Sequence, residues 1–402
     1  RDKWDRLSKV YTETKVPHFR VGYLRAEPEA LSTNDGWAQM GIVNFKEMHK
    51  AMFVQHYNLF FVDDRSLAAG TDTLDDYRVI ILGQAHVQDG LQDRLLAWVK
   101  NGGTLMMGGG AGAYNKFGRY SGKILKETLG LTEVEYDPKK AAGIGVIRSA
   151  GREIDLKKQA KYFWYSKGKA LKAGVKVLGT YTDGSPALLS ASYGKGRVYT
   201  SLFPFGWNEE VTAVFMDWLK EVIPLPEATC DEPLVEPVLR QDKEGNRYLC
   251  IINVNWDKAV QPLFVLDGKY TNLVDLGLGS GIPVATKVRQ GMTTFTRNLD
   301  PGEGTILWLG KRQETSQPDG KAKAAWVGYF AVEKKVVGCR KEGMALEVEI
   351  KVLAAMKADI ENKKYAEAAL KGQTIRRSIE QKSARAGADA LLVLAKGLTG
   401  KI

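Results

Sequence analysis

The stretch that decides the fold reads YRVIILGQAH at 77–86 and, after an intervening segment, NGGTLMMGGGAGAYNKFGR at 101–119. Its two apolar runs, 79–82 and 104–107, are typical of buried strands. Turn-forming residues follow each run. The stretch therefore predicts two neighbouring strands of a parallel sheet.

The segment between the two runs is predicted to be an amphipathic helix over 89–100. Leu91, Leu95 and Val99 recur every four residues, which places them on one helix face. The helix ends at Gly102-Gly103, because glycine adopts the left-handed conformation that a helix C-terminus needs. Strand, helix and strand form one βαβ unit with a right-handed crossover.

A glycine-rich turn follows the second strand and marks the place where a site would form, because sites of open α/β sheets lie at the carboxyl ends of strands. We name it the glycine turn; it contains Gly108, Gly109, Gly110, Ala111 and Gly112. The turn carries no reactive side chain. We therefore interpret its glycines as residues that permit close packing and a tight turn.

The remaining chain divides by the period of its apolar residues. We expect a lead-in linker at 1–17, an α/β domain at 18–226 with an insertion at about 131–180 that covers the sheet edge, a small all-β sandwich at 234–310 and a helical tail at 322–402. Evenly spaced short strands with turn signals predict the sandwich. Further elements of the α/β domain are predicted at about 19–24, 37–56, 58–63, 121–129, 187–203 and 209–222.

Length and charge narrow the classes of function. A chain of 402 residues is too long for one average domain, and its net charge is +11. The segment 321–402 holds 17 Lys and Arg against 9 Asp and Glu, a surplus of 8, so most of the basicity belongs to the tail. Because the tail charges of both signs alternate, they indicate a solvated helix face. We expect no nucleic-acid partner.

No segment of the chain reads as a membrane span or a signal peptide, since no run approaches 18 apolar residues. We expect a soluble protein without a membrane partner, in a compartment that the sequence leaves open. Cys230, Cys250 and Cys339 lie far apart without metal-ligand spacing, which favours buried, inert thiols. We predict no metal site and no cofactor.

A covalent acyl-transfer site would need a Ser or Cys on the glycine turn and a His base within reach. Every residue at 108–113 is Gly or Ala, and the loop 203–209 has no His. His86 is the one histidine expected at a strand's carboxyl end, and we favour a hydrogen-bonded loop residue there. The turn also lacks the Lys-Ser/Thr that a phosphate-binding loop requires. We predict no catalytic residue.

Other polar and aromatic residues are expected near the same edge of the sheet. Loop carboxylates such as Asp63, Asp64 and Glu209 show no spacing that singles out the pair required for glycoside hydrolysis. The aromatic side chains could stack on a sugar ring or pack in an interface. The candidate ligand-binding residues are Trp37, His86, Tyr114, Arg119 and Trp207.

Three stretches of the α/β domain resemble a known family. They are FFVDDRSL at 60–67, DYRVIIL to NKFGR at 76–119, and GSPALL to YGKGRVY at 184–199. They resemble the trimerisation domain of family 42 glycoside hydrolases, the β-galactosidases. The segment 234–310 is similar to the small C-terminal domain that follows it. The insertion and the tail lie outside the recognised pattern.

The resemblance implies a flavodoxin-like or class I glutamine amidotransferase-like fold without amidotransferase chemistry, since Gly and Ala stand where that family has its Cys. The catalytic barrel that precedes this domain in the family is absent from residues 1–402. The resemblance therefore implies a non-catalytic accessory region that forms a homo-oligomer and serves a glycoside hydrolase domain or a carbohydrate ligand. Two alternatives stay open. One is a stand-alone carbohydrate-binding module, and the other is a divergent hydrolase that uses His86 with loop carboxylates.

Overall fold

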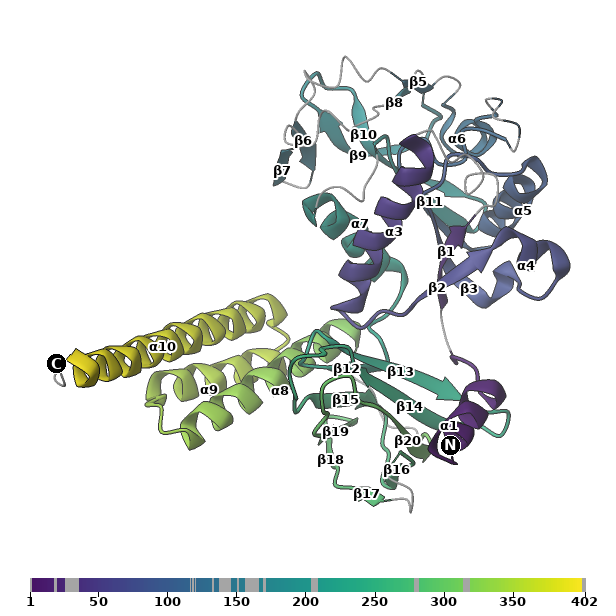
Figure 1. Ribbon diagram of the computed structural model, residues 1–402. Helices are drawn as coiled ribbons and strands as arrows, with labels where there is room; N and C mark the ends of the chain where they lie inside the picture. Colours follow the sequence, from purple (N-terminus) through teal and green to yellow (C-terminus); the bar gives the residue numbers. More distant parts are fainter. Residues whose placement is uncertain are drawn as a thin grey trace. The chain divides into compact units, whose positions relative to one another are not determined.

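The protein is described by a computed structural model, which divides into two compact units, residues 17–224 and residues 1–16 with 225–402. The described residues are 2–17, 20–25, 36–115, 117, 119, 121–131, 134–136, 146–149, 152–155, 166–168, 171–203, 209–277, 282–313 and 319–399. Figure 1 shows the helices and strands of each unit.

A nine-stranded sheet forms the centre of the first unit, in the order β2-β1-β3-β4-β11-β10-β9-β6-β7. The first five strands run parallel, and they include the two strands of the predicted βαβ unit. Their bounds are β1 Arg20–Arg25, β2 Leu59–Asp63, β3 Tyr77–Leu82, β4 Thr104–Met107 and β11 Gly196–Ser201.

The other four strands run antiparallel, so the prediction of a parallel sheet is corrected to a mixed one. They are β6 Val146–Ser149, β7 Arg152–Asp155, β9 Lys176–Tyr181 and β10 Pro186–Tyr193. Three of them, β6, β7 and β9, come from the predicted insertion at about 131–180. The insertion thus extends the sheet beyond β10. A separate antiparallel pair joins β5 Val134–Tyr136 and β8 Ser166–Gly168.

Helices cover both faces of the parallel part of the sheet, as Figure 1 shows. Alternate strand residues point to opposite faces. Ile81 and Tyr199 pack with α3 Gly36–Phe53 and α7 Glu209–Val222, while Ile80 and Val198 pack with α5 Asp89–Lys100 and α6 Lys123–Leu129. The short helices α4 Asp64–Ala69 and η1 Leu74–Asp76 connect β2 to β3. The sheet is thus the middle layer of a three-layer α/β unit.

Two antiparallel sheets form the sandwich of the second unit, in the orders β12-β15-β19-β18 and β13-β14-β20-β16-β17. Residues such as Phe264 of one sheet and Leu307 of the other share one buried core. The strands are β12 Ala228–Cys230, β13 Val235–Gln241, β14 Asn246–Asn253, β15 Leu263–Asp267, β16 Leu273–Asp275, β17 Ile282–Val284, β18 Lys287–Arg289, β19 Met292–Thr296 and β20 Gly304–Lys311. The strands β12 and β13 were not among those that the sequence predicted.

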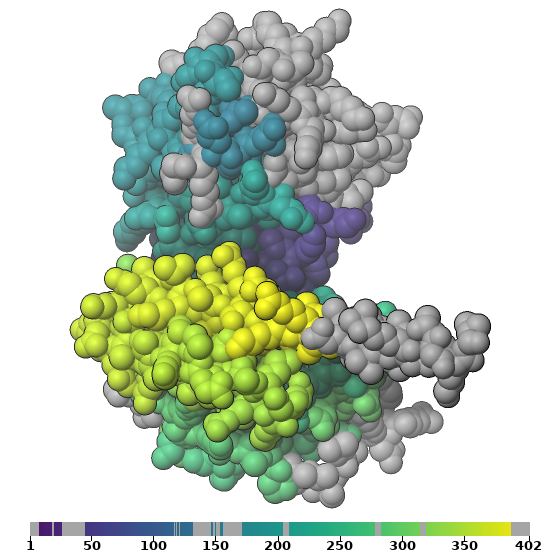
Figure 2. All heavy atoms as spheres, turned by 90° about the vertical axis from the view of Figure 1, so that its left-hand side faces the viewer, coloured from purple at the N-terminus to yellow at the C-terminus, as the bar shows by residue number. Residues whose placement is uncertain are grey.

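Three helices follow the sandwich within the same unit: α8 Gly320–Lys341, α9 Glu347–Glu361 and α10 Tyr365–Thr399. Figure 2 shows their described side chains as yellow-green and yellow spheres. Lys323 of α8 makes an ion pair of 2.8 Å with Asp267 of β15, and both side chains are buried. The tail is thus fixed to the sandwich by a buried polar contact as well as by apolar packing.

Residues 2–13, within the predicted lead-in segment, form helix α1 Asp2–Glu13. The guanidinium of Arg240 on β13 donates hydrogen bonds to the Thr14 hydroxyl and the Tyr11 carbonyl. Val10 packs on the outer side of the same sheet, near Cys250. The amino-terminal segment therefore belongs to the sandwich unit.

Within the described part of the chain, no helix combines the length and the apolar character that a membrane crossing requires.

Candidate functional site

The glycine turn lies at the carboxyl end of β4 and is held by backbone hydrogen bonds. The N–H of Gly108 donates to Leu82, that of Gly109 to Phe203 and that of Gly112 to Gln84, at 3.1, 2.8 and 2.9 Å. A loop that cradles a phosphate must direct such N–H groups at the ligand. Because these donors already bond carbonyls, the turn is a structural corner.

Steric packing closes position 109 of the turn to a side chain. A Cβ at Gly109 would lie 2.5 Å from the backbone Cα of Phe203, closer than real side chains approach backbone. Gly110 and Gly112 have φ of 75° and 66°, in the left-handed region that favours glycine. The geometry thus excludes a side chain at Gly109 and disfavours one at the other two positions.

His86 and Tyr114 are the two candidate ligand residues that the structure brings together. Their backbones form an isolated β-bridge in which the N–H of Val87 donates to the Tyr114 carbonyl, and their rings stack with centroids 5.4 Å apart. Burial raises the pKa of the Tyr114 hydroxyl. Arg119 is exposed, and its backbone N–H bonds the Asn115 side chain. The Trp37 side chain and the whole of Trp207 lie outside the described residues.

The loop carboxylates near this edge have structural roles. Asp63 caps α4 by accepting from the backbone N–H groups of Arg65 and Ser66. Asp64 accepts from the Gln88 side chain at 3.3 Å, and burial, followed by the charge of Asp63, raises the pKa of its carboxyl group. Glu209 forms an exposed ion pair with Lys50 at 3.0 Å. None of these contacts pairs two carboxylates across a site.

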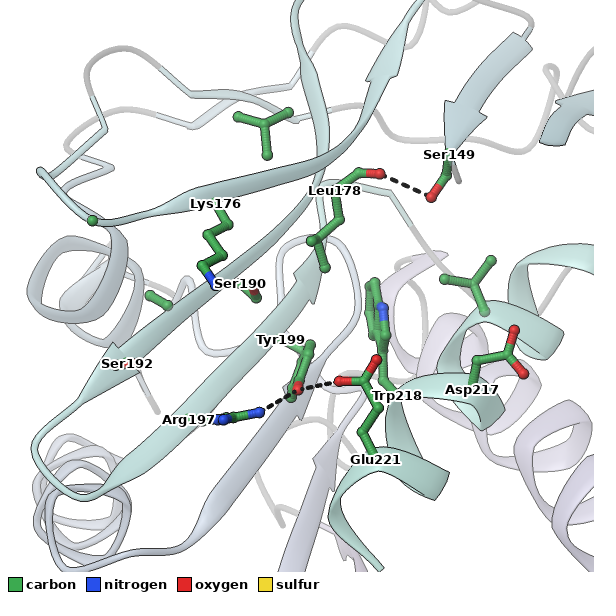
Figure 3. Close-up of a pocket in the computed structure, with 14 residues that line it drawn as sticks. Ser149, Lys176, Leu178, Ser190, Ser192, Arg197, Tyr199, Asp217, Trp218 and Glu221 are labelled. Atoms are coloured by element: carbon green, nitrogen blue, oxygen red, sulfur yellow. Dashed lines mark hydrogen bonds between the residues drawn. The ribbon is translucent and has the colours of Figure 1, made fainter. Parts of the chain in front are cut away.

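A groove of about 710 Å³ lies at the other end of the sheet, between α7 and the strands β9–β11 (Figure 3). Arg197 of β11 pairs with Thr104, the first residue of β4, so the groove lies near the amino ends of β4 and β11. We call it the α7 groove. Its lining residues are Ser149, Gly174, Lys176, Val177, Leu178, Ser190, Ala191, Ser192, Arg197, Tyr199, Val214, Asp217, Trp218 and Glu221.

A chain of hydrogen bonds crosses the α7 groove. The Arg197 guanidinium donates to the Tyr199 hydroxyl at 3.4 Å, and that hydroxyl donates to Glu221 Oε2 at 3.0 Å (Figure 3). The Tyr199 ring stacks on Trp218, with centroids 5.2 Å apart and 24° between the planes. Burial raises the pKa of Tyr199, so the hydroxyl stays protonated and remains a donor. The buried Tyr199 is therefore fixed in place and links Arg197 to Glu221, two exposed charged residues.

The sequence-based prediction missed this groove because it searched the carboxyl edge alone. The signal was present: Ser190 and Ser192 alternate on β10 directly opposite Tyr199 and Arg197 on β11. Polar residues in register on a strand pair are unexpected where a helix covers the sheet.

Among the residues that the structure describes, no three His, Cys, Asp or Glu side chains lie close enough together to hold a metal ion. Burial raises the pKa of Cys230 to about 12 and that of Cys250 to about 11. These two thiols are buried and poorly ionised, as the sequence predicted, whereas Cys339 is only half-buried, contrary to that prediction.

Comparison with known proteins locates the similarity in the α/β unit. Residues 47–205 match the family model of the beta-galactosidase trimerisation domain. This region contains the glycine turn, β11 and all three stretches that carry the resemblance in the sequence. The resemblance to that domain is therefore confirmed for these residues. No curated protein sequence matches the chain.

Solved structures share the fold at low identity. A catalytic mutant of Gan42B, a GH42 beta-galactosidase from G. stearothermophilus, is 18% identical with a TM-score of 0.52 over 74% of this chain. Alpha-L-fucosidase isoenzyme 2 from Paenibacillus thiaminolyticus is 12% identical with a TM-score of 0.50 over 78% of this chain. The match covers 41% of the beta-galactosidase and 51% of the fucosidase. The likeness shows a common fold.

Proposed function

We propose that this chain is a non-catalytic, self-associating accessory region of a carbohydrate-active protein related to the GH42 beta-galactosidases. On this proposal its α/β unit has a flavodoxin-like, amidotransferase-like fold whose former nucleophile turn is closed. A glycoside hydrolase domain or a carbohydrate would be its functional partner.

One observation carries the proposal: the region that matches the trimerisation domain contains a site-like turn that has no nucleophile and is closed by backbone packing at Gly109. Residues 47–205 carry the match, and within them Gly109 packs against the Phe203 backbone. A domain whose site position is filled by backbone packing supports a structural role better than a catalytic one.

A row of aromatic rings at the sheet edge, exposed at Phe61 and His49 and half-buried at Phe45 and Phe53, supports self-association. The edge strand β2 carries Phe61, which is 58% exposed, and its ring centroid lies 4.4 Å from that of Phe45 on α3. His49 and Phe53 continue the row along the helix. The His49 ring centroid lies 5.4 Å from that of Phe45 and 6.0 Å from that of Phe53. We call these four residues the aromatic row.

The aromatic row has the composition of a protein interface. Aromatic side chains are enriched in the cores of interfaces, and an unpaired edge strand is a ready surface for another chain. We propose that a second copy covers the row.

Light scattering on the purified chain tests the proposal. We expect a species heavier than one chain at all but the lowest concentrations. A strict monomer over the whole range would contradict it. Purified chain that hydrolyses aryl glycosides, with the activity lost in His86→Ala, would show instead that the chain is catalytic.

A further inference from the structure

The α7 groove is not used by the function proposed above. We propose that it binds a neutral, hydroxyl-rich ligand, a short carbohydrate. The choice of carbohydrate among hydroxyl-rich ligands rests on the proposed function, whereas the neutral and hydroxyl-rich character rests on the groove itself.

Size and shape fit a small ligand. Sites for small molecules are concave and measure about 300–1,000 Å³, and the groove measures about 710 Å³. It forms because the sheet continues past α7: Tyr199 of β11 packs against Trp218, while β10 and β9 extend further (Figure 3). The groove is thus built by regular elements rather than by loops.

The positive and negative charges that line the groove are equal in number. Lys176 and Arg197 contribute two cations, and Asp217 and Glu221 contribute two carboxylates. A site for phosphate or another anion would show an excess of cations. A sugar hydroxyl both donates and accepts, so a sugar needs donors and acceptors side by side. The balanced lining, together with the Ser190 and Ser192 hydroxyls, meets that need.

The principal donor and acceptor are preorganised. The Tyr199 hydroxyl bonds both Arg197 and Glu221, and only 4% of Tyr199 is exposed. A guanidinium has five N–H donors and a carboxylate has two acceptor oxygens, so these hydrogen bonds engage part of each group. A ligand would therefore meet two charged groups that the Tyr199 hydroxyl already orients, which lowers the entropic cost of binding.

The lining does not suit the core of a protein interface. Such cores are apolar and depleted of charge. Of the large apolar side chains that line the groove, Val177 is 45% exposed, whereas Trp218 is 5% exposed. A second copy of the chain is therefore a less favoured occupant of the groove than a small ligand, and the experiment below includes it as an outcome.

Calorimetric titration of the full chain with lactose and with cellobiose tests the proposal. We expect saturable binding of at least one disaccharide and no binding of inorganic phosphate. Arg197→Ala should weaken binding about tenfold or more, because it removes a charged hydrogen-bond donor. Ser192→Trp keeps every charged group and should abolish binding by filling the groove.

Arg78→Ala is the matched control. Arg78 is also an exposed strand arginine, and its guanidinium donates a hydrogen bond of 3.3 Å to the Gly102 carbonyl, but it lies on β3 on the α5 side of the sheet. It should leave the affinity unchanged. Melting temperatures of all three variants establish that they fold.

Several outcomes would overturn the proposal: no heat with either sugar, equal losses in Arg197→Ala and Arg78→Ala, or saturable binding of phosphate. If Ser192→Trp changes the oligomeric state instead of sugar binding, the groove is an interface. Oligomeric state is measured separately on the same samples. A monomer that binds lactose through Arg197 would refute self-association and leave the groove assignment intact.

Discussion

The backbone N–H of Gly109 donates a hydrogen bond of 2.8 Å to the carbonyl oxygen of Phe203, and the two residues are in direct backbone contact. The buried Ser201 hydroxyl donates to the same carbonyl. The glycine turn after β4 and the segment after β11 therefore form one packed corner. A side chain at position 109 would need space between them, and the corner leaves none.

Gly109→Ala is expected to destabilise the chain by about 1–3 kcal/mol, because overpacked side chains force the backbone to shift. The added Cβ would lie 2.5 Å from the Phe203 Cα, where no flexible side chain can move away. Chemical denaturation measures the change in unfolding free energy.

The matched control is Gly90→Ala, in the first turn of α5, where a Cβ has no neighbour within 4 Å. Alanine is the better helix former by about 1 kcal/mol, so this variant should be neutral or slightly stabilising. Equal stability of the two variants would show that the corner can open.

The ion pair between Lys323 and Asp267 is expected to couple the tail to the sandwich. Lys323 is 7% exposed and also donates to the carbonyl of Pro226 at 3.0 Å. Lys323→Met should cost about 3–5 kcal/mol, because it leaves the Asp267 carboxylate buried without its partner. Thermal or chemical unfolding followed by circular dichroism reports the loss.

A double-mutant cycle isolates this coupling. Lys323→Met combined with Asp267→Leu should cost clearly less than the two single costs added together, since neither charge then remains unpaired. Strict additivity would mean that the two side chains do not interact in solution.

Asp242 is expected to make the sandwich sensitive to acid. Its carboxylate accepts from the Glu244 and Asn246 backbone and from the Asn246 and Tyr248 side chains. Partial burial acts to raise the pKa, but these hydrogen bonds outweigh it and lower the pKa below 3.8. The stabilisation is therefore complete above about pH 4 and is lost as the pH falls through the folded-state pKa.

Asp242→Ala should cost about 1–2 kcal/mol at neutral pH, and the cost should shrink as the pH falls through the lowered folded-state pKa of the wild-type carboxyl group. Urea unfolding at a series of pH values gives this difference. A constant difference for Asp242→Ala would contradict the account.

Much of the α/β unit was predictable, because its signals are local. The spacing of Leu91, Leu95 and Val99 and the glycines after them fix helix α5, and the apolar runs on either side fix β3 and β4. The antiparallel strands at 146–181 were not predicted, since they are short and polar and depend on pairing with β10 for their existence. Local pattern does not determine such pairing.

The site was less predictable than the fold. The absence of a nucleophile at 108–113 could be read directly, but the steric closure of Gly109 depends on Phe203, which is distant in sequence. The α7 groove joins Arg197, Tyr199 and Glu221, and each alone has the pattern of an ordinary strand or helix residue. Only the packing of α7 against the antiparallel strands β10 and β11 brings them together.

The most direct test of the account is sedimentation velocity on wild type, Phe61→Glu and Phe117→Glu over a wide concentration range. Phe117, 73% exposed, is the matched control because it lies outside the aromatic row. We predict wild-type and Phe117→Glu species well above the 44.5 kDa of one chain, and dissociation of Phe61→Glu to the monomer, since a buried interface charge costs about 2 kcal/mol or more. A monomeric wild type, or an oligomer that Phe61→Glu leaves intact, would contradict the account.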